Sequence, residues 1–350
     1  MKRIALICPG RGTYTRSELG ILTDPARGGS VVRDDLVRRA DLWRTAIRRK
    51  TIAELDGAER FGAAHLKGEN AAALIYTAGA VDAASLADDL EVVCVLGNSM
   101  GWYTALHVAG VFSFEDGLRL SDTMGGMQAT EGVIGGQVIV SVVDEQWRPD
   151  PVMIDAVDGA VEQVNRDGHR AWTSIRLGGY RVLAGDQDGV RLLLQSLPKQ
   201  VIGEREYPFQ LLGHSAFHTP LMSGTSQRGY GELAELPWSA PAIHLIDGRG
   251  QVFRPLTSRE DHIRDYTLGH QVTSEYDFTH SLRVALREFA PDALVLLGPG
   301  DTLGGAIGQV LVEEGWSGVR SKADFLARQR GDEPLLFAMG RPEQRVAVAR

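Results

Sequence analysis

A run of five apolar residues, Val92–Leu96, leads directly into the pentapeptide Gly97-Asn98-Ser99-Met100-Gly101. The pattern G-x-S-x-G is typical of a nucleophile elbow, in which a buried strand turns sharply into a helix and presents a serine at the edge of the sheet. An ordinary strand–turn–helix junction that needs small residues fits the same pattern. The sequence therefore predicts a strand over 92–96, a helix over 102–111 and a candidate nucleophile, Ser99, between them.

The length, charge and cysteine content of the chain limit which folds and which partners are expected. The 350 residues, 43% of them hydrophobic, suffice for one large α/β domain or for a core with an inserted subdomain. A formal net charge of −8 argues against a nucleic-acid partner. The two cysteines, Cys8 and Cys94, lie in apolar runs, so we expect neither a disulfide framework nor a metal site. Because no apolar run reaches the length of a signal peptide or a membrane span, we expect a cytoplasmic protein without a membrane partner.

Strand and helix patterns alternate along most of the chain, which is typical of an α/β fold. Outside its middle third we expect strands over 4–8, 243–245 and 293–297 and helices over 34–66, 70–90 and 114–128. The first strand ends in a glycine-bearing loop, Pro9–Gly12, at the edge where α/β proteins keep their sites. From about residue 324 onward the sequence is rich in arginine and weakly patterned.

The middle of the chain has a different order of elements. We expect strands over 137–143, 171–176, 180–184 and 204–209 and helices over 151–164 and 186–197. The order β-α-β-β-α-β is that of a small ferredoxin-like unit. Since strand patterns resume after it, this unit is predicted to be inserted in the larger domain.

A serine nucleophile needs a base. Of the nine histidines, two lie in the segment Gly213–Met222, and either His214 or His218 could reach Ser99. A loop histidine is also often a hydrogen-bonding residue without a catalytic role. No aspartate stands in an obvious motif for the order Ser…Asp…His.

Four segments together resemble the malonyl-CoA:acyl-carrier-protein transacylase family and the related acyltransferase domains of polyketide synthases. They are Pro9–Gly12, Gly97–Gly101 with the following Tyr103–Leu106, Ala216–Met222 and Gly298–Gly300. The resemblance covers roughly residues 1–310. It implies an α/β-hydrolase-like core with a parallel sheet over 1–128 and 200–320, a ferredoxin-like insert over 129–199, and a C-terminal tail over 321–350.

The resemblance also implies a Ser–His dyad and a ping-pong reaction without a bound cofactor or metal. An acyl group passes from acyl-coenzyme A to the serine and then to the phosphopantetheine thiol of an acyl carrier protein. By position, Ser99 resembles the nucleophile and His218 the base. The amides of Arg11 and Met100 resemble the oxyanion hole, and Gln271 resembles a residue that supports the histidine.

Several residues depart from the family pattern. The family elbow reads G-H-S-x-G-E, whereas Asn98 and Trp102 stand here, and the first motif G-Q-G-S-Q is replaced by Gly10–Tyr14. The arginine that clamps a malonyl carboxylate aligns with Met124, and Arg119 is the neighbouring family arginine. An unpaired buried carboxylate costs about 3–5 kcal/mol, so malonyl is disfavoured.

The other residues expected in the acyl pocket disagree on whether the acyl group is charged. Arg176 in the insert or Arg11 at the mouth could supply a replacement cation, although Arg176 could equally be a solvated strand residue. Phe217 resembles the version of its motif that accepts malonyl and disfavours a branched acyl group. We therefore expect a small, unbranched, uncharged acyl group.

Two alternatives stand beside the transferase: an acyl hydrolase that clears acyl groups from carrier proteins, and a non-catalytic relative that binds a carrier protein. The second is disfavoured because Ser99, His218 and Gln271 are all present. Carrier proteins are acidic and this chain is net negative, so a carrier requires a local basic face. Arg48-Arg49-Lys50 or the C-terminal arginines could form it.

Overall fold

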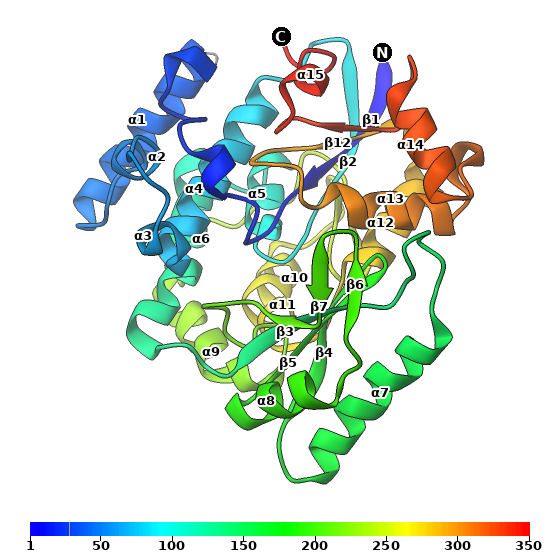
Figure 1. Cartoon of the computed structure of the whole chain (residues 1–350). Coiled ribbons are helices and arrows are strands. Elements are labelled where there is room, and N and C mark those ends of the chain that lie inside the picture. The colour runs from blue at the N-terminus through cyan, green and yellow to red at the C-terminus, as the bar shows by residue number, and fades with distance from the viewer. Residues whose placement is uncertain (28) are drawn as a thin grey trace.

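A six-stranded sheet forms the centre of the molecule (Figure 1). The computed structural model describes residues 1–27 and 29–350. In spatial order the strands are β10 (Val252–Phe253), β9 (Leu245–Ile246), β2 (Leu90–Gly97), β1 (Lys2–Cys8), β12 (Ala293–Leu296) and β13 (Leu336–Ala338). All neighbours are parallel except β10, which is antiparallel to β9. The predicted parallel sheet is therefore confirmed.

Helices cover both faces of this sheet. Alternate residues of β1 enter two different apolar clusters, one shared with α5 (Gly101–Val108) and one shared with α12 (Phe278–Phe289) and α13 (Gly304–Glu313). Burial on both faces explains why these strands are continuously apolar rather than alternating.

A second helical layer lies outside α5. The largely buried α4 (Gly68–Ala84) packs against α6 (Phe114–Glu131) and α1 (Val31–Ala46). The prediction of one helical stretch over 34–66 is wrong, because the chain forms α1, then α2 (Ile52–Asp56) and α3 (Ala63–Leu66). The helix predicted over 70–90 also ends early, at residue 84, because the chain must turn there to enter β2.

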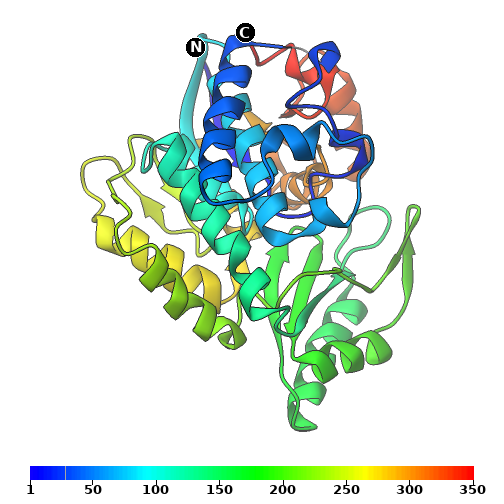
Figure 2. The same cartoon turned by 90° about the vertical axis from the view of Figure 1, so that its left-hand side faces the viewer.

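The insert has its own five-stranded sheet, seen as a lobe beside the core in Figure 2. Its elements are β3 (Gly136–Ser141), α7 (Pro151–Arg166), β4 (Ala171–Leu177), β5 (Tyr180–Gly185), α8 (Gln187–Ser196) and β8 (Phe209–Gln210). The strand order is β11-β4-β5-β3-β8, where β11 (Tyr276–Asp277) comes from the core. Apolar residues of α7 and α8 cover one face of this sheet. The predicted β-α-β-β-α-β order is confirmed as far as α8, and its last strand is not.

The end of the insert differs from the prediction. Instead of one strand over 204–209, a hairpin of β6 (Gln200–Ile202) and β7 (Arg205–Tyr207) precedes β8. Gly203 turns the chain back at a φ of +61°, and Pro208, which has no N–H for a strand ladder, separates β7 from β8. Because β8 pairs with β3, the sheet of the insert uses residues beyond the expected boundary at 199.

The C-terminal segment is more ordered than its sequence pattern indicates. After α14 (Lys322–Arg330), β13 pairs in parallel with β12 at the edge of the main sheet, and α15 (Pro342–Arg345) follows. The sequence did not predict β13, because a strand of only three apolar residues gives no recognisable pattern. The remaining helices are α9 (Ser223–Glu232), α10 (Glu260–Asp265) and α11 (Gln271–Thr273). No helix in the described part of the chain has both the length and the apolar character to cross a membrane.

Candidate active site

Ser99 lies in the sharp turn between β2 and α5 with a φ of +52°, which a serine rarely adopts. The glycines on either side make this turn possible. A Cβ atom on Gly101 would lie 2.1 Å from the carbonyl oxygen of Cys8, and one on Gly97 would lie 2.4 Å from the backbone of Gly101. The elbow is thus pressed against the end of β1, as a strained nucleophile turn requires.

His218 is the histidine that the structure brings to Ser99. Its Nε2 lies 2.7 Å from Ser99 Oγ, and its Nδ1 lies 2.5 Å from the main-chain carbonyl oxygen of Gln271. A carbonyl oxygen only accepts, so Nδ1 carries the proton and Nε2 accepts from the serine hydroxyl. The ring is almost fully buried, and burial lowers the pKa of His218 to about 4. His214 instead places its Nδ1 3.1 Å from Gln137 Oε1.

Gln271 and two tyrosines hold the elbow and the base together. The Gln271 side chain donates to the carbonyl oxygen of Ser99 over 3.2 Å and accepts from Tyr103 Oη over 3.4 Å. Tyr276 donates to the carbonyl oxygen of Gly97 over 2.6 Å, and its ring lies 5.4 Å from that of His218. The sequence named Tyr103 only as part of the segment after the elbow, without a role, and it did not indicate Tyr276, because nothing in their spacing shows that they meet at the site.

Two backbone amides are available beside the elbow. Within residues 1–27 and 29–350, neither the amide of Arg11 nor that of Met100 donates a hydrogen bond. Met100 immediately precedes α5, where the helix dipole favours negative charge. Arg11 lies in the loop after β1, next to the elbow, and its side chain donates to Gln128 Oε1 and to the carbonyl oxygen of Leu66. The two amides can therefore serve an oxyanion.

A cavity of about 810 Å³ opens beside Ser99. Its wall on the insert side is one face of the insert sheet, formed by Ile139, Ile175, Leu177, Tyr180, Val182 and Phe209. Its wall on the core side includes Met124 and Gln128, which lie four residues apart on α6 and so share a face. Phe217 also lines the cavity. Met124 is only 2% exposed, so it borders the cavity with a small part of its surface.

The structure places Arg176 outside the cavity lining. Its neighbours on β4, Ile175 and Leu177, face the cavity, and side chains two apart share a face of a strand. Arg176 is paired across the sheet with Arg181 and makes ion pairs with Glu275 and Asp277. In the described part of the chain, the arginines that line the cavity are Arg11 and Arg205.

The two residues that differ from the family elbow, Trp102 and Asn98, lie in different surroundings. Trp102 is fully buried, donates to Thr267 Oγ1 over 2.8 Å and packs edge-on against Tyr266. It is therefore a packing residue of the core. Asn98 lines the cavity, and its buried Oδ1 has no hydrogen-bond partner among the described residues.

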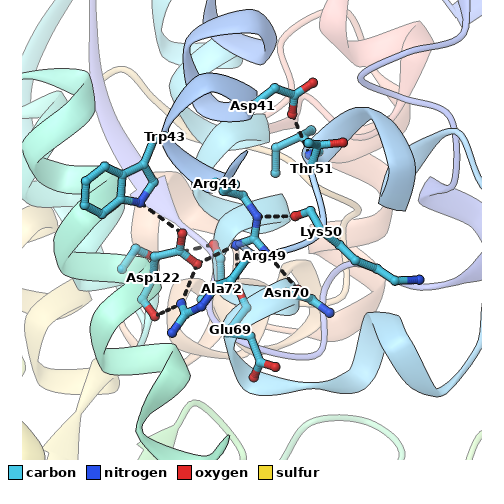
Figure 3. Close-up of polar contacts among 12 residues, drawn as sticks. Asp41, Trp43, Arg44, Arg49, Lys50, Thr51, Glu69, Asn70, Ala72 and Asp122 are labelled. Atoms are coloured by element: carbon cyan, nitrogen blue, oxygen red, sulfur yellow. Dashed lines mark hydrogen bonds and ion pairs between the residues drawn. The ribbon is translucent and has the colours of Figure 1, made fainter. Parts of the chain in front are cut away.

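Buried ion pairs fix α6, which carries Met124 and Gln128. Figure 3 shows Arg44 and Arg49 converging on Asp122, at 2.5 and 3.0 Å. Both Arg44 and Asp122 are fully buried. Gly126 allows this approach, because a Cβ atom there would lie 2.3 Å from Arg49 Nη2. The network thus locks α6 to α1.

Metal ligands do not gather in the described residues: no three His, Cys, Asp or Glu side chains lie where they could hold one ion. Cys8 and Cys94 are both buried and unpaired. Burial raises the pKa of the Cys94 thiol to about 12.

Comparison of the sequence with known proteins gives one partial match. No family model matches the chain. A non-reducing polyketide synthase, mapC, of Penicillium roqueforti is 31% identical over 162 residues. The match covers 45% of this chain and only 6% of that synthase.

Solved structures match over nearly the whole chain. A malonyl-CoA:ACP transacylase of Synechocystis sp. has a TM-score of 0.73 at 18% identity, covering 99% of this chain and 100% of that one. An acyl-carrier-protein S-malonyltransferase of Burkholderia pseudomallei gives 0.73 at 20% identity, covering 98% of each chain. A malonyl-transacylase in complex with its type II polyketide acyl-carrier protein gives 0.74 at 18% identity, covering 99% of this chain and 98% of that one. The chain therefore has the fold of the malonyl-CoA:acyl-carrier-protein transacylases, together with a partial sequence match to a polyketide synthase.

Proposed function

We propose that the protein is an acyltransferase that moves an acyl group from coenzyme A to an acyl carrier protein through an acyl-enzyme on Ser99. The observation that carries the proposal is the 2.7 Å contact between Ser99 Oγ and a neutral His218 at the edge of a large cavity. An unactivated serine is a poor nucleophile, and a base at this distance supplies the activation.

The proposed reaction has two halves. In the first, Ser99 Oγ attacks the thioester carbonyl, His218 Nε2 takes the hydroxyl proton, and the C–S bond breaks. The proton then passes to the departing coenzyme A thiolate. In the second half the carrier thiol gives its proton to His218 and attacks the acyl-enzyme carbonyl, the ester C–O bond to Ser99 breaks, and His218 returns the proton to Ser99 Oγ. The amides of Arg11 and Met100 stabilise the oxyanion in both halves, each contributing on the order of 10²–10³ in rate.

We propose an uncharged acyl group as substrate. Met124 is apolar and stands at the position of the expected clamp. The insert side of the cavity is mostly an apolar sheet face, to which Gln137, Glu204 and Arg205 add polar groups. Arg176, paired with acidic residues outside the cavity lining, does not support a relocated clamp. The same dyad can deliver the acyl group to water, so acyl hydrolysis is the second candidate.

A carrier protein as partner is supported by the malonyl-transacylase solved with its carrier. The expected basic segment 48–50 is only partly available, because Arg49 is engaged with Asp122 while Arg48 and Lys50 are exposed. At the C-terminus, Arg341, Arg345 and Arg350 each form an ion pair with an aspartate. Attraction between exposed charges weakens with salt, so carrier transfer should slow as ionic strength rises.

The test is intact-protein mass spectrometry after rapid quench with acetyl-, butyryl-, malonyl- and methylmalonyl-coenzyme A. We expect an adduct on the wild type that Ser99→Ala abolishes. If no donor leaves an adduct at any quench time and no free acid is released, the proposed covalent mechanism is wrong. Adding holo-carrier then separates the two candidates: acyl on the carrier thiol indicates transfer, and free acid indicates hydrolysis.

A further inference from the structure

The cavity contains a polar cluster that the proposed chemistry does not use. The side chains of Arg11, Gln128, Gln137 and His214 all line it. Arg11 lies close to His214: its charge acts on the His214 ring, and a Cβ atom on Gly213, the residue before His214, would lie 3.8 Å from Arg11 Nη2. The orientation of each polar atom in this cluster follows from its hydrogen bonds.

Arg11 presents N–H donors to the cavity. An arginine only donates, so Gln128 Oε1 must be the acceptor of the 2.9 Å bond between them. The amide of Gln128 is thereby oriented, and its Nε2 donates to Ser215 Oγ over 2.7 Å. The second Arg11 bond goes to the carbonyl oxygen of Leu66 over 2.7 Å. Both of these bonds go to neutral acceptors, and Glu69 is the carboxylate that acts on the charge of Arg11, so its remaining N–H groups are left for a ligand in the cavity.

His214, in contrast, presents a hydrogen-bond acceptor, the lone pair of a ring nitrogen. Ser174 Oγ donates to the carbonyl oxygen of Phe217 over 2.9 Å and therefore accepts from Gln137 Nε2, also over 2.9 Å. Gln137 Oε1 consequently faces His214 Nδ1 at 3.1 Å, so Nδ1 carries the ring proton. Burial and the charge of Arg11 lower the pKa of His214 to about 3. The ring is thus neutral at pH 7, and its Nε2 accepts hydrogen bonds.

We propose that Arg11 and His214 Nε2 form a subsite for a hydroxyl group on the acyl chain, a specificity that rests on the proposed acyl transfer. A hydroxyl oxygen accepts from the guanidinium while its hydrogen is donated to Nε2. A carboxylate satisfies Arg11 but places a second lone pair against Nε2. A plain alkyl chain leaves both groups without a partner when it displaces water, which is unfavourable.

An amide of the pantetheine arm of coenzyme A also donates and accepts hydrogen bonds. The test must therefore distinguish a subsite for the acyl hydroxyl from one for the pantetheine arm. The probes are butyryl-, 3-hydroxybutyryl- and 4-hydroxybutyryl-coenzyme A. Binding is measured by calorimetry on a Ser99→Ala background, where no turnover occurs, so the result does not depend on whether the proposed reaction takes place. His214→Phe removes the acceptor at similar shape, and His214→Gln can place an amide oxygen near the position of Nε2. His262→Phe, at an exposed histidine of α10, is the matched control.

We expect at least one hydroxybutyryl donor to bind about tenfold more tightly than butyryl-coenzyme A. His214→Phe should abolish that ratio, His214→Gln should retain part of it, and His262→Phe should leave it unchanged. Equal binding of all three donors to Ser99→Ala overturns the proposal, as does a preference that survives His214→Phe. A loss of affinity that is the same for every donor also overturns it, because it assigns the subsite to the pantetheine arm.

Discussion

The imidazole Nδ1 of His218 lies 2.5 Å from the main-chain carbonyl oxygen of Gln271. The base is therefore oriented by the backbone and not by a carboxylate, and no side-chain substitution at position 271 can remove the acceptor. This arrangement fixes the tautomer that leaves Nε2 free for the Ser99 hydroxyl. It also brings no negative charge to offset the burial of the ring, which explains the lowered pKa.

The first prediction concerns the identity of the base. His218→Ala should lower the second-order rate of Ser99 acylation by about 10²–10⁴, because general-base catalysis is lost. His214→Ala should cost much less, since His214 is bonded to Gln137. The measurement is rapid-quench mass spectrometry with butyryl-coenzyme A. The reverse ranking of the two variants would show that the wrong histidine has been chosen.

The second prediction is the pH dependence. A histidine is a general base only when unprotonated, that is, above its pKa. Because the pKa of His218 is lowered from 6.5 to about 4, the ring stays unprotonated at mildly acidic pH. The acylation rate at low substrate should stay nearly constant from neutral pH down to about pH 5 and fall below about pH 4. Circular dichroism at each pH separates this fall from unfolding. An inflection near pH 6.5 would contradict the buried, neutral base.

The elbow and its serine were predictable because their signal is local. Two glycines within five residues, after an apolar strand, specify the turn almost alone. The candidate base was narrowed by sequence only to His214 or His218, and the resemblance favoured His218. The choice depends on where the loop places each ring, which involves α11 more than fifty residues away.

Other features depend on register and on distant contacts. A shift of one residue exchanges the faces of a strand, so sequence alone did not place Arg176 on the side away from the cavity. The cluster of Arg11, Gln128, Gln137 and His214 joins four separate segments, and single polar residues carry no periodic signal. The strand β13 was too short to produce a pattern.

The third prediction concerns stability. Asp122→Ala should lower the free energy of unfolding by about 3–5 kcal/mol, because it leaves the fully buried Arg44 without a counter-ion. Asp35→Ala is the control on α1: Asp35 pairs with Arg38 on the surface, so the change should be much smaller. Urea unfolding followed by circular dichroism measures both. If the two variants lose equal stability, the buried network does not anchor α6.

The fourth prediction concerns the acyl group. Wild type should acylate faster with butyryl- than with malonyl-coenzyme A, because Met124 stands at the clamp position and cannot pair a carboxylate there, and a carboxylate held by Arg11 would meet the lone pair of His214 Nε2. Met124→Arg should raise the malonyl-to-butyryl rate ratio at least about tenfold, since a paired carboxylate avoids much of a penalty of about 3–5 kcal/mol. Met124→Leu, of similar volume and also apolar, should leave the ratio nearly unchanged.

Two further variants test Arg11 and Arg176 as the clamp if that expectation fails. If wild type takes malonyl fastest, Arg11→Gln tests the arginine in the loop next to the elbow, and loss of the malonyl preference would assign the clamp to Arg11. Arg176→Ala should not alter the ratio, because its guanidinium is held by Glu275 and Asp277 outside the cavity lining. A malonyl preference that Arg176→Ala destroys would mean that β4 turns Arg176 toward the substrate, and the uncharged acyl assignment would be wrong.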